Sequence, residues 1–315
     1  MAQPPDRPNR DGFGEGLLEL ARKDSRVVAI TADLTSSMRL SAFQSAFPHR
    51  FWNVGIAEQH MVAMAAGLAS EGYLPFIATY GSFFLRAVDQ IRISICLNNL
   101  NVKLVSGHGG LAVGQDGGSA QVLEDVAVYR ALPGMTVISP VDAVEVKKAT
   151  IAMSEHQGPA VIRVARQSSR IITTSRDPFV IGRGEVLRQG TDCVVVGTGP
   201  VLVEALLASE ALEKEGLSIG VVNIHTIKPI DSALLVEVAE QTGCVVTVED
   251  HQVIGGLGSA VTEVLSERYP VPVERVGVMN RFGQSGSSAE LWKDYGLDST
   301  GIKRAVRRVL KRKKL

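Results

Sequence analysis

The segment VGIAEQH, residues 54–60, directly precedes a run of small and apolar side chains over residues 61–69. This pattern predicts a helix over residues 56–69 with Glu58 at its start. Burying an ionised glutamate costs free energy unless the carboxylate finds a partner or takes up a proton. Glu58 is therefore placed to share a proton with a group that arrives from outside. The structural alternative is a glutamate that only interacts with the helix macrodipole.

Short apolar strands alternate with helical patterns on both sides of this segment. Strands are predicted over residues 27–32, 74–79, 102–106, 136–139 and 160–164, and helices over residues 84–97 and from residue 142. Such alternation indicates a parallel sheet covered by helices.

A polar stretch of mixed charge over residues 167–190 is predicted to be a linker. A second α/β pattern follows it, with strands over residues 193–196, 219–223, 245–248 and 273–278 and helices over 201–215, 232–242, 259–269 and about 301–310. The expected fold class is α/β with two domains, each a mostly parallel sheet covered by helices. The predicted domains are residues 11–166 and 191–315.

The composition excludes several classes of protein. The 315 residues are 45% hydrophobic and 21% charged, which is typical of a globular protein. The net charge is zero, so no basic surface for nucleic acid or a membrane is expected. Three scattered cysteines do not form a disulfide framework, and no apolar run approaches the ~18 residues of a membrane span. With a polar N-terminus in place of a signal peptide, we expect a cytoplasmic protein.

Two polar and aromatic motifs follow predicted strands, at the edge where open α/β sheets bind ligands. In the segment from Thr79 to Arg86, Tyr80 and Phe83 are spaced to stack on a flat heteroaromatic ring, unless they are core residues. Residues 106–119 contain six glycines, which let the backbone approach a ligand closely.

These motifs resemble those of the transketolase group of thiamine diphosphate enzymes. In that group the motif glutamate, here Glu58, hydrogen-bonds the aminopyrimidine ring of the cofactor, and Tyr80 and Phe83 match aromatic residues that stack on it. The resemblance also places Asp33 and Arg86 in the cofactor region, although a surface ion pair is an alternative for Arg86.

The resemblance further implies a set of substrate contacts. His108 and Asp116 correspond to groups that contact sugar hydroxyls, and His108 is also a catalytic candidate. Ser37 and Arg166 correspond to the phosphate contacts, although a helix cap explains Ser37 equally well. Many transketolases carry a histidine after the Asp-Gly pair, where this chain reads Ser-Ala-Gln with Gln121 as a weak substitute.

Two further features have structural interpretations. Arg163 and Arg170 flank Arg166 and are expected on the linker surface. The glycine-rich segment 255–258 has the composition of an anion site at a helix start, but a structural turn is the preferred interpretation.

The Gly-Asp-Gly motif that holds the metal and the diphosphate in this group does not occur here. The resemblance covers only the pyrimidine-binding and C-terminal domains. It implies a C-terminal subunit that transfers two-carbon ketol units between sugar phosphates, with thiamine diphosphate and Mg²⁺ (or Ca²⁺) held mainly by an N-terminal subunit in a heterotetramer. The alternatives are a deoxyxylulose-phosphate synthase-like enzyme, a 2-oxoacid dehydrogenase beta subunit and a non-catalytic partner-binding module.

Overall fold

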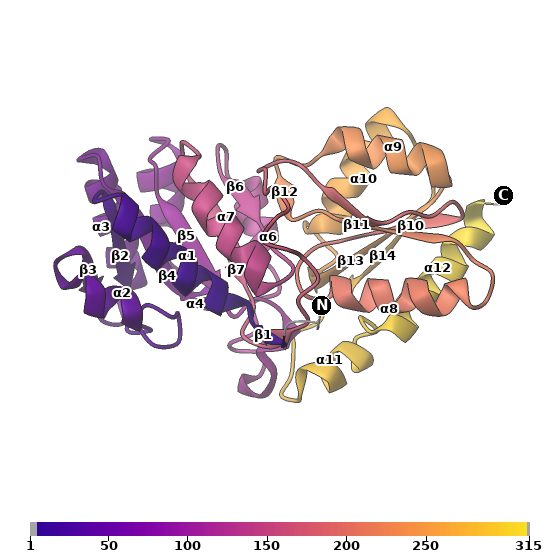
Figure 1. The fold of residues 1–315 in the computed structure, drawn as a ribbon, viewed down its shortest axis with the longest axis horizontal. Helices are drawn as coiled ribbons and strands as arrows, with labels where there is room; N and C mark the ends of the chain where they lie inside the picture. Colours follow the sequence, from indigo (N-terminus) through magenta and orange to yellow (C-terminus); the bar gives the residue numbers. More distant parts are fainter. Residues whose placement is uncertain (1–4, 314–315) are drawn as a thin grey trace.

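Two sheets lie side by side along the long axis of the molecule in the computed structural model (Figure 1). The structure describes residues 5–313. The first four residues of the polar N-terminal segment and the last two residues of the second predicted domain lie outside this range.

Seven strands form the first sheet, in the order β12-β6-β7-β5-β4-β2-β3. Their bounds are Val27–Thr31 (β2), Phe51–Asn53 (β3), Leu74–Tyr80 (β4), Lys103–Gly107 (β5), Thr136–Ile138 (β6), Ala160–Val164 (β7) and Thr226–Lys228 (β12). Neighbouring strands are parallel except β12, which pairs antiparallel with β6 at the edge. The central strands β2, β5 and β7 are fully buried, as expected of a parallel sheet covered on both faces.

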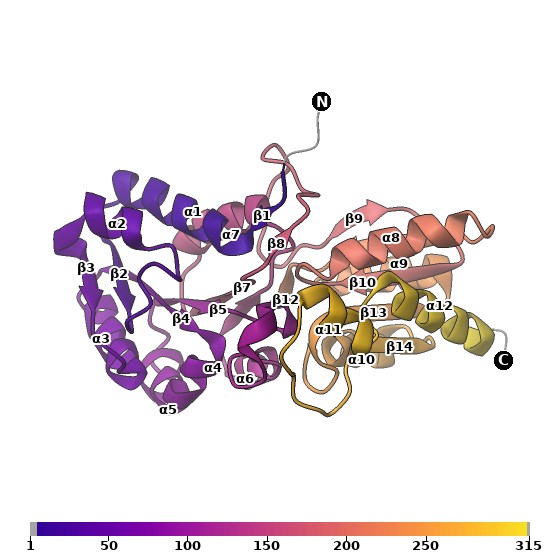
Figure 2. The same cartoon turned by 90° about the horizontal axis from the view of Figure 1, so that it is seen from below.

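Helices cover both faces of this sheet (Figure 2). On one face lie α1 (Asn9–Lys23) and α7 (Ala143–Glu155), which pack on each other. On the other face lie α3 (Glu58–Ser70), α4 (Gly81–Phe84), α5 (Val88–Gln90) and α6 (Asp125–Ala131), while α2 (Ser41–Ala46) lies near α1. The helix predicted over residues 84–97 is irregular, because it consists of short helical pieces that end in a π-helical segment, Ile91–Cys96.

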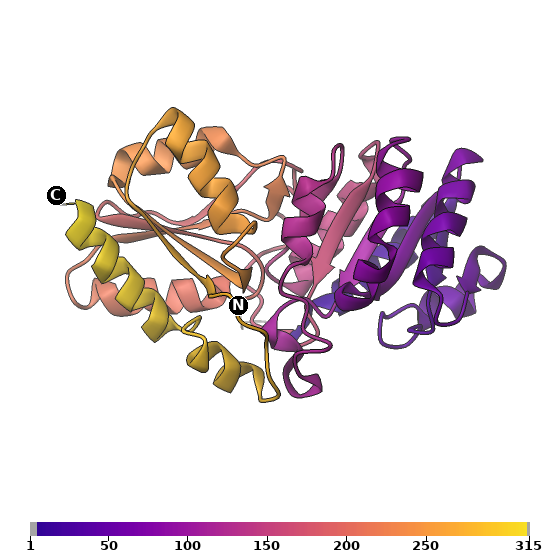
Figure 3. The same cartoon turned by 180° about the vertical axis from the view of Figure 1, so that it is seen from behind.

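The second sheet has five strands in the order β14-β13-β10-β11-β9. They span Glu185–Arg188 (β9), Cys193–Gly197 (β10), Ile219–Asn223 (β11), Val245–Gln252 (β13) and Val273–Val278 (β14). Helices α9 (Ser232–Thr242) and α10 (Leu257–Arg268) cover one face, and α8 (Leu202–Glu213) and α12 (Ser299–Lys313) cover the other (Figure 3). Helix α11 (Ser288–Asp294) extends toward the first sheet.

The predicted linker is partly structured. Within it, β8 (Ser168–Ser169) pairs with β1 (Arg7–Pro8), and β9 is the antiparallel edge of the second sheet. One hydrophobic cluster also runs across both halves of the chain, from α3 to α9 and α10. Across residues 5–313, none of the helices combines the length and the apolar character that crossing a membrane requires.

Candidate active site

Four of the predicted site residues lie at one edge of the first sheet. Asp33, Tyr80, His108 and Arg166 end or closely follow β2, β4, β5 and β7, which are neighbours in the sheet. Since parallel strands have their carboxyl ends at the same edge, the topology brings these side chains together.

Three rings stack at this edge. The Tyr80 ring centroid lies 3.6 Å from that of His108 and 5.2 Å from that of Phe83, with interplanar angles of 28° and 24°. The guanidinium of Arg86 lies 5.2 Å from the centroid of the Phe83 ring. The structure thus joins the two predicted aromatic residues to His108 in one stack and places Arg86 beside it.

Glu58 is the first residue of α3, and its side chain is only 5% exposed. Its Oε1 atom is buried and has no hydrogen-bond partner among the described residues. The Nη1 atom of Arg86 lies 3.6 Å from this oxygen, but the Arg86 side chain is 60% exposed. Buried polar atoms are normally hydrogen-bonded, so this oxygen fits a ligand that brings its own donor.

Asp33 and His108 both have left-handed backbone conformations, each with φ of 61°. This region is sparsely populated by residues other than glycine, and such residues concentrate at functional sites. Asn53 supports Asp33, because its Oδ1 accepts from the Asp33 amide at 3.0 Å and its Nδ2 donates to Asp33 Oδ1 at 3.2 Å.

His108 is buried, and its Nδ1 atom has no partner in the described part of the chain. Burial lowers the pKa of His108 to about 3, and the nearby Arg10 and Arg166 act in the same direction. The imidazole is therefore neutral near pH 7, which leaves one ring nitrogen as a hydrogen-bond acceptor and the other as a donor.

Two guanidinium groups line a pocket of about 310 Å³ between the halves of the chain. The Nη1 atom of Arg166 donates to Asp116 Oδ1 at 2.8 Å, and that of Arg10 donates to the backbone oxygen of Ser37 at 3.0 Å. Guanidinium groups suit phosphate and similar anions. Sequence reasoning missed Arg10, since a single arginine in a polar segment gives no local signal.

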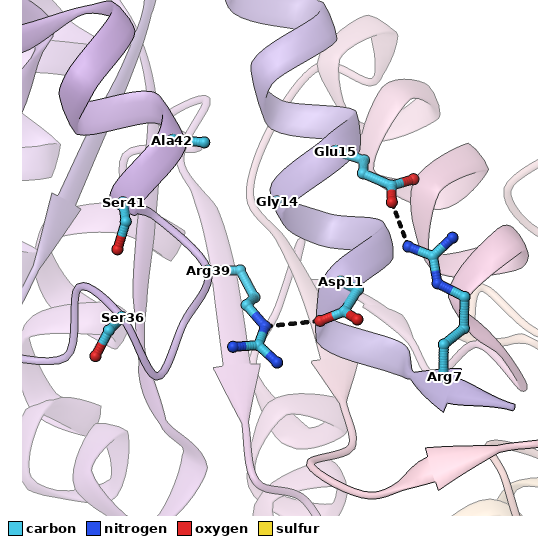
Figure 4. Close-up of a pocket in the computed structure, with 8 residues that line it drawn as sticks. All are labelled: Arg7, Asp11, Gly14, Glu15, Ser36, Arg39, Ser41 and Ala42. Atoms are coloured by element: carbon cyan, nitrogen blue, oxygen red, sulfur yellow. Dashed lines mark hydrogen bonds and ion pairs between the residues drawn. The ribbon is translucent and has the colours of Figure 1, made fainter.

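A second pocket, of about 410 Å³, lies between α1 and α2 beside the Ser36 position (Figure 4). Both of its guanidinium groups pair with carboxylates of α1, Arg39 with Asp11 at 2.6 Å and Arg7 with Glu15. We assign no ligand to this pocket.

The side chain of Gln121 makes structural contacts through its amide nitrogen. Its side chain is buried, and its Nε2 atom donates to the backbone oxygens of Leu111, Gly114 and Gln284 at 3.4, 3.0 and 3.0 Å. The amide therefore holds the glycine-rich loop together.

The expectation for Arg163 was wrong. This residue lies within β7, is 9% exposed, and donates from Nε to both carboxylate oxygens of Asp125 at 3.2 and 3.0 Å. A charged residue inside a fully buried strand must be paired, and its position in the apolar run 160–164 was the signal that it is not on the linker surface.

Two mostly parallel sheets covered by helices define a two-domain α/β protein. The chain belongs to the transketolase family: residues 7–171 match the "Transketolase, pyrimidine binding domain" and residues 182–302 match the "Transketolase, C-terminal domain". These matches confirm the family and the fold class predicted from the motifs.

Individual relatives resemble the chain over nearly its full length. The 6-deoxy-6-sulfo-D-fructose transketolase subunit SqwH of Clostridium sp. (strain MSTE9) is 41% identical over 305 residues, which are 96% of this chain and 95% of the relative. A solved structure described as a split gene transketolase, inactive beta4 tetramer, is 42% identical with a TM-score of 0.90, covering 98% of this chain and 99% of the other. The 1-deoxy-D-xylulose-5-phosphate synthase of Desulfotalea psychrophila is 38% identical, and the match covers 92% of this chain but only 46% of the synthase.

Proposed function

We propose that this chain is the C-terminal subunit of a thiamine diphosphate-dependent transketolase, which transfers a two-carbon ketol unit between sugar phosphates together with an N-terminal subunit. The observation that carries the proposal is the buried Oε1 atom of Glu58, which lies close to Arg86 beside the stack of Phe83 and Tyr80. The relatives named as a transketolase subunit and a split gene transketolase support a two-chain enzyme.

The residues of this edge fit the cofactor's aminopyrimidine. An unpartnered carboxylate oxygen suits a ring nitrogen or amino group, and aromatic faces suit a flat heterocycle. When bound, thiamine diphosphate supplies an electron sink for carbanion chemistry. Glu58 holds the shared proton at its carboxylate, Tyr80 and Phe83 orient the ring, and Asp33 and Arg86 line the same region. The partner subunit supplies most ligands of the diphosphate and its Mg²⁺ or Ca²⁺, in a heterotetramer.

The polar side chains around the pocket bind and orient the substrate. His108 and Asp116 orient hydroxyl groups, with His108 neutral, while Arg10, Ser37 and Arg166 hold the anionic end of the sugar. A relative is named for 6-deoxy-6-sulfo-D-fructose, so a sulfonate is a second candidate for that end. We also retain residues 11–166 and 191–315 as the proposed domains, with residues 167–190 between them.

Co-expression tests this proposal. We expect the isolated chain to bind thiamine diphosphate weakly and to turn nothing over, and the chain with an N-terminal transketolase subunit to be active on a panel of ketose phosphates and a sulfo-sugar. Calorimetric titration gives the cofactor affinity. Tight Mg²⁺-dependent binding by the isolated chain would contradict the two-subunit assignment.

A deoxyxylulose-phosphate synthase-like activity is the second candidate, because the match to such a synthase spans 92% of this chain. Pyruvate and glyceraldehyde 3-phosphate separate the two candidates. A synthase releases carbon dioxide from pyruvate, whereas a transketolase moves a ketol unit from a ketose donor without gas release.

A further inference from the structure

The carboxylate of Asp250 reaches from the second sheet to the glycine-rich loop of the first. Asp250 lies on β13 and is 4% exposed. Its Oδ1 atom accepts from the Leu111 amide at 2.8 Å, and its Oδ2 atom accepts from the Ala112 amide at 3.2 Å and from Trp292 Nε1 at 3.0 Å. One buried carboxylate thus receives three N–H donors, two of them from the loop.

The loop is shaped around this carboxylate. Gly110 has φ of 86°, and a Cβ atom there would clash with Asp250 Oδ2. The two bonded amides begin the 3-10 helical segment Leu111–Asp116, whose last residue pairs with Arg166. Ser288 of α11 adds a bond from its Oγ to the Ala112 oxygen at 3.1 Å. The segment that carries Asp116 is therefore held from the second half of the chain.

A carboxylate is required here rather than an amide. In an asparagine, one of the two oxygens becomes an NH₂ group, which would face a buried N–H donor in either orientation. Burial raises the pKa of Asp250, while Arg163 and the amide donors oppose that shift. Arg163 Nη2 also donates to the Asp250 backbone oxygen at 3.0 Å, which connects the carboxylate's own strand to β7.

We propose that Asp250 is a positioning residue, which fixes the glycine-rich loop so that Asp116 and His108 meet the sugar hydroxyls in the correct orientation. This inference rests on the proposed function for the sugar contacts themselves. It gives the C-terminal half a defined task at the substrate site, although Asp250 touches neither substrate nor cofactor.

Glu249 provides a matched control on the same strand. Its buried carboxylate also accepts two backbone amides, Leu257 N at 2.7 Å and Gly258 N at 2.8 Å, but these begin α10 and not the loop. That pairing also explains the 255–258 segment, because the Glu249 carboxyl group itself accepts the amides at this helix start. Glu249→Gln thus removes the same kind of interaction at a different place.

Hydrogen–deuterium exchange of the full chain tests the loop directly and needs no turnover. We expect Asp250→Asn to speed exchange across residues 109–118 by about tenfold or more, because losing an acceptor of the Leu111 or Ala112 amide loosens the loop at the point where these amides hold it. Glu249→Gln should speed exchange at residues 256–260 and leave the loop unchanged. Unchanged loop exchange in Asp250→Asn would overturn the proposal, even if no transketolase activity is ever found.

Steady-state kinetics of the enzyme reconstituted with its N-terminal subunit test the consequence. We expect Asp250→Asn to raise KM for the sugar about tenfold with a smaller change in kcat, while cofactor affinity stays unchanged, since the two loop residues that we assign to a ligand, His108 and Asp116, are assigned to the substrate. Glu249→Gln should leave KM within about twofold of the wild type. A faster-exchanging loop with an unaltered KM would overturn the positioning role.

Trp292→Phe keeps the test valid if Asp250→Asn does not fold. This change removes the Trp292 Nε1 donor to Asp250 Oδ2. The phenylalanine side chain has no polar atom, so the substitution introduces no unpaired buried group at position 292. We expect about threefold faster exchange of the loop, because the carboxylate is then held only by the loop amides. No change in loop exchange would again overturn the proposal.

Discussion

Replacing Glu58 by glutamine should reduce activity without reducing stability. In the chain alone, the unpartnered Oε1 atom represents an unfavourable desolvation of roughly 1–3 kcal/mol. The interactions that oppose it are small. The ion pair with Arg86 is 3.6 Å long to a side chain 60% exposed and contributes at most about 1 kcal/mol, and the helix dipole adds about 0.3–1 kcal/mol.

Glutamine keeps the size of the side chain and removes its charge. We therefore expect the free energy of unfolding of Glu58→Gln, measured in urea, to stay equal to the wild type or rise by about 1 kcal/mol. If Glu58 only stabilises the start of α3, the variant instead loses the dipole and ion-pair terms and becomes about 1–2 kcal/mol less stable.

Activity is measured in the reconstituted enzyme under saturating cofactor. A lost proton-transfer group typically lowers turnover by about 10²–10⁴-fold, so the expected loss is of that order with cofactor binding retained. The matched control is Glu71→Gln, an exposed change just after the same helix, which should alter stability by less than about 0.5 kcal/mol. Lower stability with near-normal turnover in Glu58→Gln would refute our reasoning and return Glu58 to a structural role.

Two further changes test other parts of the site and the interior. Arg166→Ala should raise KM about tenfold or more for sugar phosphates and much less for unphosphorylated hydroxyaldehydes, because a lost anion contact removes uniform binding; equal effects on both would make Arg166 structural. Burial lowers the pKa of His225 to about 4, so the folded chain resists a proton that the unfolded chain binds below about pH 6.5. His225 therefore lowers the free energy of unfolding as the pH falls from about 6.5 to about 4, by up to about 1.4 kcal/mol per pH unit. In urea unfolding, the free energy of unfolding of His225→Gln should rise relative to that of the wild type by the same amount over this pH range. A difference that stays flat with pH would contradict this, and the exposed His49→Gln is the control variant for the same measurement.

Local patterns predicted the elements that are buried on both faces. The strands over residues 27–32 and 160–164 are mostly apolar runs, interrupted only by Thr31 and Arg163, and such runs are readily recognised. The strands that escaped prediction are β1, β3, β8, β9 and β12, all four residues long or shorter. They lie at sheet edges or in the two-stranded sheet, and β9 and β12 pair with partners far along the chain. The helix over residues 84–97 was predicted but its irregular form was not, because helical periodicity alone does not distinguish α, 3-10 and π turns.

The candidate site divides in the same way. Glu58, Tyr80 and His108 were recognisable because each lies in a local motif at a strand end or a helix start. Arg10 and Asp250 were not, since their importance comes only from contacts with residues remote in sequence, such as the bond from Leu111 to Asp250. Gln121 was read from the motif only as a weak substitute for a histidine, and its bonds to the backbone oxygens of Gly114 and Gln284 could not be predicted from the sequence.

The placement of β12 has a consequence for how this chain responds to proteolysis and to separate production of its halves. The strand belongs by sequence to the second half, yet it covers the β6 edge of the first sheet. A protease that nicks residues 171–184 would leave two fragments that migrate as one particle, held by the shared strand and the common apolar cluster. The first half produced as a separate polypeptide would present an open β6 edge and aggregate. The two halves thus depend on each other for a covered sheet edge and a common apolar cluster.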